Sequence, residues 1–198
     1  MPFPSTPWRL TAHAWLSLFW LRETGRWDRP AGLYAAAFVD YRPGGVLSYH
    51  ELLVARLLGV GRGPRVRVTD IWVDSEESMA GGRTLWALPK QLADLPLQDT
   101  SLGAAARTSF SGVAEGRVLA AATFTALPGA AVVRLPFGLT TSQVRDDGST
   151  LVTSAAGSGR PVPCHGSWRF PADGPLAFLH RRRPVLSVAL RDVRLRFG

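Results

Sequence analysis

The sequence predicts a mainly β (α+β) protein in which antiparallel strands form a barrel or a sandwich, with a few short helices. Three observations lead to this fold class. Short apolar or alternating segments recur along the chain, turn residues separate them about every 8–15 residues, and only two segments carry helix signals. The 198 residues contain no internal repeat and no compositional linker, so we expect a single domain over residues 1–198.

The strand signals are apolar runs and alternation of apolar with polar residues. Alternation is clearest near the C-terminus, where Val193, Leu195 and Phe197 are separated by arginines. Residues 154–159 are small and polar and predict a short flexible loop. We expect strands over residues 14–20, 33–41, 48–58, 65–73, 108–113, 118–127, 131–135, 150–155, 167–170 and 185–197.

The main helix signal follows the strand expected at 65–73. Residues 74–77, Asp-Ser-Glu-Glu, are typical of a helix start because acidic and hydroxyl side chains stabilise the first turn. Residues 78–85 can form two turns, and Pro89 ends the helix because proline disfavours helical geometry in the residue before it. A second short helix is expected over residues 176–181.

The net charge of +8 comes almost entirely from arginine. Of the 23 basic residues, all except Lys90 are arginines, and they are spread along the chain with one short run at 181–183. A nucleic-acid site gathers its basic residues on one surface. A general preference for arginine therefore explains the charge better than nucleic-acid binding, which stays as a third hypothesis for the function.

Several other classes of protein are disfavoured by simple counts. The single cysteine, Cys164, excludes an intramolecular disulfide and a cysteine-rich metal site, and the histidines show no metal-ligand spacing. The longest apolar run, residues 10–21, is too short to cross a membrane and lacks the cleavage pattern of a signal peptide. We expect a cytoplasmic protein with no metal and with neither a membrane nor a nucleic acid as partner.

Lys90 is the only amine side chain in a sequence that otherwise uses arginine. Arginine stays protonated at ordinary pH, whereas a buried lysine can lose its proton and act as a nucleophile. The neighbours Leu85, Trp86, Leu88 and Leu92 make the setting apolar. Burial in such a setting lowers the pKa of a lysine. The local sequence therefore permits an activated amine, and the alternative is a surface lysine that survived by chance.

The residues around Lys90 resemble a known family. Residues 82–93, Gly-Arg-Thr-Leu-Trp-Ala-Leu-Pro-Lys-Gln-Leu-Ala, are similar to the G-R-E-x-x-x-x-P-K-K-x element of the acetoacetate decarboxylase family. Upstream, Tyr49-His50-Glu51 resembles the Tyr-x-Glu of that family at the same distance from the lysine, with no gap. Residues 71–74 fit the strand that leads into the helix. The resemblance covers residues 33–95 and, more loosely, 168–198.

The resemblance implies a fold and a chemistry. The fold is a closed, conical, largely antiparallel β-barrel with a central pocket, and members of the family commonly form oligomers. The resemblance implies that Lys90 is the Schiff-base lysine, which joins a keto acid as an imine and so draws electrons from the carbon–carbon bond that breaks. Glu51 would orient the substrate or transfer a proton. No cofactor is implied, and a homo-oligomer is expected.

Two positions depart from the pattern of the family. Gln91 stands where the family has a second lysine, so burial alone is left to lower the pKa of Lys90. Gln91 is still expected to bind a carbonyl, hydroxyl or carboxylate group of the substrate. The same ungapped alignment places Ala36 where the family has a further pocket glutamate, which leaves Glu51 as the remaining carboxylate.

Two further residues have two interpretations each, and two others have one. Arg83 binds a substrate carboxylate, or it braces the helix against a nearby carboxylate or carbonyl. Tyr49 donates to a substrate oxygen, or it merely shares the inner face of the barrel with Glu51. Trp86 is expected to be a wall of the pocket. His50 should point away from the pocket because successive strand residues face opposite sides.

The sequence thus leads to three hypotheses, in order of preference. The first is a Schiff-base lyase that acts on a keto acid by decarboxylation or by aldolase or dehydratase chemistry, and not on acetoacetate itself. The second, suggested by Gln91 and Ala36, is a non-catalytic barrel that binds a small apolar or acidic ligand. The third is the nucleic-acid-binding domain suggested by the charge.

Overall fold

The computed structural model describes residues 3–22, 29–61, 63–102, 105–127 and 133–198. In this part of the chain there are eleven strands, one α-helix and one short 3-10 turn. The elements are β1 (Trp8–Leu21), β2 (Gly32–Arg42), β3 (Tyr49–Val60), β4 (Pro64–Val73), α1 (Glu76–Trp86), β5 (Lys90–Leu92), β6 (Leu97–Leu102), β7 (Ala105–Ala114), β8 (Arg117–Ala126), β9 (Leu135–Val144), β10 (Thr150–Arg169), η1 (Ala177–Leu179) and β11 (Leu186–Phe197).

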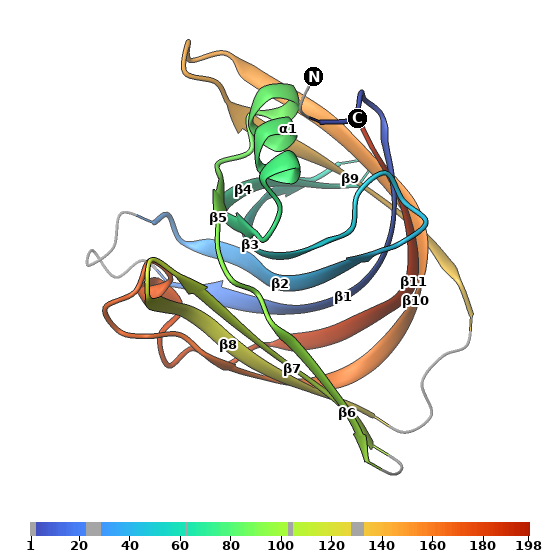
Figure 1. Ribbon diagram of the computed structural model, residues 1–198. Coiled ribbons are helices and arrows are strands. Elements are labelled where there is room, and N and C mark those ends of the chain that lie inside the picture. Colours follow the sequence, from blue (N-terminus) through green and yellow to red (C-terminus); the bar gives the residue numbers. More distant parts are fainter. Residues whose placement is uncertain (1–2, 23–28, 62, 103–104, 128–132) are drawn as a thin grey trace.

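Seven of the described strands form a closed ring. Their order is β1-β2-β3-β4-β9-β10-β11, and β11 closes the ring because it pairs with both β10 and β1. Helix α1 lies at one end of this ring (Figure 1). The fold-class prediction of a mainly β protein is confirmed, and the expected closed barrel is found as this hydrogen-bonded ring of strands.

The remaining long strands form an extension of the sheet outside the ring. Strand β8 pairs with residues 164–169 of β10, and β7 and β6 follow in antiparallel order. This extension lies on the side of β1 and β2 away from α1 (Figure 1). It packs there through aromatic side chains, such as Phe38 stacked on Phe110 with ring centroids 4.7 Å apart. One face of β1 and β2 thus lines the inside of the ring. The other face packs against the β6–β8 extension in a core rich in aromatic side chains, which we call the aromatic compartment.

Not all pairings are antiparallel, in contrast to the prediction. Strand β4 pairs in parallel with β5 and with β9. The parallel β4–β5 pair is possible because α1 crosses from the end of β4 back to the start of β5, which is the connection that parallel neighbours require. This crossover places Lys90 at the beginning of β5.

The helix predictions hold with small shifts. Ser75 caps α1, and its side chain accepts a hydrogen bond from the backbone N–H of Ser78. The helix ends at Trp86, and Ala87 adopts a left-handed conformation before Pro89. The second expected helix is only the short turn η1. No helix among the described residues is long and apolar enough to cross a membrane.

The strand predictions fail mainly in the polar and glycine-rich segments. Residues 154–159, expected as a loop, lie within the twenty-residue strand β10. Strand β9 begins at Leu135, where the strand expected at 131–135 should end, and residues 131–132 of that expectation lie outside the described residues. Strands β5 and β6 were not expected either. In β9 and β10, polar and small residues replace the alternation of apolar and polar residues that predicts a strand. Backbone pairing, rather than side-chain burial, holds these segments in the sheet.

Gly157 shows why part of β10 consists of small residues. A Cβ atom at this position would lie 2.2 Å from the carbonyl oxygen of Arg194 on β11 and 3.0 Å from the ring of Phe137 on β9. Backbone atoms cannot move aside as a flexible side chain can, so only glycine allows the two strands to approach at this point.

We expect Gly157→Ala to lower the free energy of unfolding by about 1–3 kcal/mol, because the added methyl group overpacks the β10–β11 pair. Gly59→Ala is the matched control, since a Cβ there meets nothing within 4 Å, and it should leave stability unchanged or slightly improved. Urea denaturation of both variants measures the difference. Equal stability of the two variants would contradict the close approach.

Candidate active site

Sheet register brings Lys90 and Glu51 to one face. Lys90 of β5 lies beside Ile71 of β4, and Glu51 of β3 lies beside Val73 of the same strand. Ile71 and Val73 are two residues apart, so all four side chains point to the same side of the sheet. Two segments 39 residues apart in the sequence therefore meet over β4, inside the ring.

The Lys90 nitrogen has three partners for its three N–H groups. Nζ donates to Glu51 Oε2 at 2.9 Å, to Ser78 Oγ at 2.8 Å and to the Tyr49 hydroxyl at 3.4 Å. Both members of the ion pair are buried, Lys90 at 2% and Glu51 at 3% exposure. The second carboxylate oxygen of Glu51 accepts from the Tyr41 hydroxyl at 3.3 Å. The site is thus a fully paired ammonium and carboxylate, as a buried charge requires.

The segment between α1 and β5 holds the lysine chain in place. A Cβ at Gly82 would lie 2.6 Å from Lys90 Cδ, so the lysine stem passes directly over the glycine. The Nε–H of Arg83 donates to the backbone carbonyl of Lys90 at 2.7 Å. Leu88 N–H donates to the Gly82 carbonyl, which closes the end of the helix. Gly82 and Arg83, which precede the turn, therefore fix the side chain and the backbone of Lys90, which follows it.

The ion pair lines a cavity of about 280 Å³ inside the ring. Its walls come from β1, β2, β3, β4, β9, β10, β11 and the end of α1, and most of them are apolar. Trp86 closes part of the wall, with its ring edge-to-face against Trp8 at 4.7 Å and Phe197 at 4.6 Å between centroids. A small molecule in this cavity would be enclosed by apolar side chains with the Lys90–Glu51 pair at one side.

Two opposing effects act on the pKa of Lys90. Burial lowers the pKa, but the carboxylate of Glu51 and the Tyr49 hydroxyl together raise it by more, so the pKa lies above the ordinary value of 10.5. The expectation that burial alone would lower the pKa of this lysine is therefore wrong for the unliganded protein. Its resting form is the ammonium.

The two tyrosines beside the pair stay protonated. Burial raises the pKa of Tyr49 to about 12, with the Lys90 ammonium acting against that effect. Burial, followed by the negative charge of Glu51, places the pKa of Tyr41 well above its ordinary value. Both hydroxyls are thus available as donors at neutral pH.

The chemistry open to this arrangement follows from the short Lys90–Glu51 contact. A proton can pass across the 2.9 Å hydrogen bond and leave a neutral amine beside a carboxylic acid. The amine is then a nucleophile for a carbonyl carbon, and the acid is a proton donor for the oxygen that departs. Among the described residues, no group of three or more His, Cys, Asp or Glu side chains is placed to hold a metal ion.

The structure brings some of the predicted site residues together and separates others. Tyr49 and Trp86 line the cavity with Lys90 and Glu51. Arg83 and Gln91 are exposed and face a shallow surface depression on the other side of β5. Neither Gln91 nor Arg83 lines this cavity, although both were expected to contact the substrate. Gln91 follows Lys90 on a strand and so points the opposite way, and Arg83 donates to the Lys90 carbonyl, which is the bracing role that was its alternative interpretation.

Ala36 does not face the cavity, although the ungapped alignment places it where the family has a pocket glutamate. Ala36 is fully buried in the aromatic compartment between β1, β2 and the β6–β8 extension, and Ala35 and Ala37 on either side of it line the cavity. A glutamate at position 36 would therefore not reach Lys90. Its absence says nothing about the number of carboxylates in the site.

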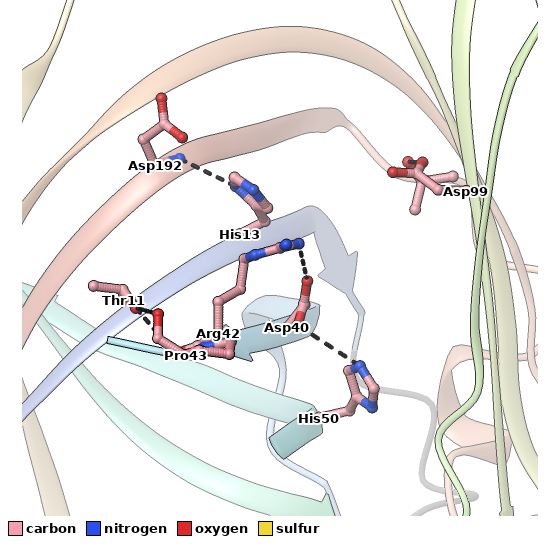
Figure 2. Close-up of polar contacts among 9 residues, drawn as sticks. Thr11, His13, Asp40, Arg42, Pro43, His50, Asp99 and Asp192 are labelled. Carbon is pink, nitrogen blue, oxygen red and sulfur yellow. Dashed lines mark hydrogen bonds and ion pairs between the residues drawn. The ribbon is translucent and has the colours of Figure 1, made fainter. Parts of the chain in front are cut away.

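His50 points to the outside of the ring, in line with its position beside Glu51 on β3. Its Nδ1 lies 2.7 Å from Asp74 Oδ2, and its Nε2 lies 3.7 Å from Asp40 Oδ1. Figure 2 shows the part of this outer network around Asp40, which contacts both His50 and Arg42. The hydrogen bond to Asp74 raises the pKa of His50. The network ties β3 to the residue just before the helix cap, without reaching the cavity.

Sequence reasoning missed two polar groups of the site. Ser78 was read only as a helix residue, although it lies one turn before Gly82 on the face that meets the lysine stem. Tyr41 lies two residues after Val39, which pairs with Glu51, and so shares its face. The helical spacing from Ser78 to Gly82 was a usable signal, whereas the β2–β3 register was not available from the sequence.

Comparisons with known proteins agree with this fold. The family model described as acetoacetate decarboxylase matches residues 26–152. No curated protein matches the chain. An acetoacetate decarboxylase from Legionella pneumophila subsp. pneumophila str. Philadelphia 1 superposes with a TM-score of 0.72 at 15% identity, covering 100% of this chain and 87% of that one.

Two further solved structures are similar. The enduracididine biosynthesis enzyme MppR with HEPES bound has a TM-score of 0.71 at 16% identity, covering 100% of this chain and 88% of the other. An acetoacetate decarboxylase-like enzyme from Sphingomonas wittichii RW1 has a TM-score of 0.67 at 14% identity, covering 100% and 92%. At these identities the likeness shows a common fold.

We expect Glu51→Gln to lower the pH at which the Lys90 amine becomes reactive. The carboxylate is what raises the pKa of this lysine, so without it burial dominates and the pKa falls below 10.5. Competitive labelling with acetic anhydride across a pH series, read by mass spectrometry at Lys90, measures the midpoint. Glu77→Gln removes the same charge from an exposed position on α1 and serves as the control. A midpoint that stays above 10.5 in Glu51→Gln would show that the carboxylate does not hold the ammonium.

Proposed function

The chain belongs to the acetoacetate decarboxylase family, and on that premise we propose that it is a carbon–carbon lyase that forms a Schiff base between Lys90 and a keto acid. The observation that carries the proposal is the position of Lys90, a residue that is 2% exposed in an apolar cavity and whose Nζ lies 2.9 Å from the Glu51 carboxylate. MppR, a protein of the same fold, is described in complex with pyruvate and with a condensation product of pyruvate and imidazole 4-carboxaldehyde.

The first half of the reaction makes the imine. The Lys90 ammonium gives one proton to Glu51 and attacks the ketone carbon as a neutral amine. Glu51 returns that proton to the hydroxyl group of the adduct, which leaves as water, and the protonated imine pairs with the Glu51 carboxylate. The Tyr49 hydroxyl oxygen lies 3.4 Å from Lys90 Nζ, from which it accepts, and we propose that its O–H donates to the substrate oxygen during these steps.

The second half uses the imine as an electron sink. In a decarboxylation, the bond between the carboxylate and the neighbouring carbon breaks, its electron pair moves towards the imine nitrogen, and CO2 leaves. The resulting enamine carbon takes a proton from solvent through Glu51, and water then hydrolyses the imine to release the ketone and the amine. In an aldolase reaction, Glu51 instead removes a proton from the carbon next to the imine, and the enamine formed attacks the carbonyl carbon of an aldehyde, whose oxygen takes that proton. In a dehydratase reaction, the enamine expels a hydroxyl group, which takes that proton and leaves as water.

The roles proposed for the side chains follow from where they lie. Lys90 and Glu51 are the catalytic residues, and Tyr49 and Trp86 bind the substrate from the cavity wall. Arg83 is a positioning residue because it acts through the backbone of Lys90. From the family resemblance we further propose a homo-oligomer that works in the cytoplasm without a cofactor.

A second candidate function is a non-catalytic barrel that binds a small apolar or acidic ligand. The raised pKa of Lys90 favours it, since a resting ammonium is not a nucleophile. In this function the Lys90–Glu51 pair would only recognise a polar end of the ligand.

Borohydride trapping distinguishes the two functions. With 3-oxo acids or pyruvate present, we expect reduction to add the mass of the substrate-derived group to Lys90, as located by peptide mass spectrometry. Lys90→Arg should give no adduct, and Glu51→Gln should reduce its rate of formation by about 100-fold or more because general acid–base help is lost. Gln91→Ala, which changes an exposed neighbour, is the control and should label normally. Ligand binding without any adduct would favour the second candidate.

A further inference from the structure

The walls of the Lys90 cavity are far more apolar than a small keto acid needs. Of the described residues that line it, Lys90 is the only basic side chain and Glu51 the only acidic one, and the two neutralise each other. None of the arginines that the structure describes lines this cavity. A second charged group on a ligand would therefore find no partner of opposite charge away from the Lys90–Glu51 pair, and its burial would be costly.

The cavity is also larger than a small keto acid. Its volume is about 280 Å³, whereas a cavity of about 150 Å³ already holds benzene, with six carbon atoms. By proportion, roughly eleven non-hydrogen atoms fill the space. Acetoacetate, with seven such atoms, would leave apolar walls facing a void or poorly bonded water.

The apolar wall continues beyond the cavity along β1 and β11. Leu16 and Leu190 line the cavity, and Trp20 and Leu186 lie on the same strand faces an even number of residues further along. Trp20 and Leu186 are each 56% exposed. Because Leu18 pairs directly with Leu186, these side chains form an apolar strip that leads from solvent to the cavity.

We propose that the substrate carries an apolar chain or ring on its carbonyl carbon, which lies along the cavity wall while the carbonyl reaches Lys90. The inference rests on the proposed Schiff-base function for the identity of the reacting group. Its substrate class is a 3-oxo acid of about eight carbons, which has the eleven non-hydrogen atoms that fill the space. The carboxylate lies next to the Lys90–Glu51 pair, and the chain points towards Leu16 and Leu190.

The test uses two ligand series on the full-length protein. Calorimetry with 2-butanol, 2-hexanol, 2-octanol and 2-decanol measures binding to the apolar wall without any imine. Turnover and borohydride trapping with 3-oxobutanoate, 3-oxohexanoate, 3-oxooctanoate and 3-oxodecanoate measure the reaction. We expect affinity and kcat/KM to rise about fourfold per methylene group until the cavity is full, and less steeply beyond, where the chain meets the strip open to water.

Two wall variants check where the chain lies. Ala155→Leu on β10 and Ala37→Leu on β2 each place a larger side chain in the cavity wall, so the steep rise should end about three carbons earlier. Ala156→Leu is the matched control, since Ala156 is exposed on the opposite face of β10. If one wall variant fails to fold, the other still gives the result.

The two proposals fail in different ways. Affinity for the alcohols that rises with chain length, without any adduct at Lys90, would support the apolar site and overturn the Schiff-base function. Adduct formation with no dependence on chain length, or a dependence that the wall variants do not shift, would overturn the inference and leave the function standing.

Discussion

The buried ion pair between Lys90 and Glu51 is the interaction on which the rest of this structure depends. An ammonium and a carboxylate without water are stable only when every donor and acceptor has a partner, and removing one member of such a pair costs about 3–5 kcal/mol. The pair therefore requires β3 and β5 to lie on either side of β4, and α1 to bring Ser78 over the lysine. The crossover helix and the closed ring are both needed to meet this demand.

The protein keeps a cavity open inside the ring because β1 and β2 each have two apolar faces. On β2, Ala35 and Ala37 face the cavity, and Ala36 and Phe38 face the aromatic compartment beneath. The dense packing of that compartment supports the wall from behind, so the cavity side can carry small side chains without collapse. The β6–β8 extension, which touches no part of the ion pair, thus contributes to the site by fixing the shape of its wall.

In the proposed Schiff-base reaction, the ion pair would also set how the chemistry starts. A resting ammonium protects the protein from unwanted reactions at the amine, since only the neutral form attacks a carbonyl. In that proposal, the reaction starts when a proton moves from Lys90 to Glu51 across the 2.9 Å hydrogen bond. The geometry of the pair would therefore control the reactivity of the lysine.

The sequence by itself determined the mainly β class, the capped helix before Lys90 and the opposite directions of His50 and Glu51, because each follows from local spacing and from the period of a strand or helix. It did not determine the long strand β10, the parallel pairs of β4 or the outward position of Gln91. Backbone pairing decided the first two, and the start of β5 at Lys90 decided the third. Only the tertiary structure decided that Ala36 lies outside the cavity and that the lysine is held as an ammonium, since both depend on strand register and on charges that meet across 39 residues of chain.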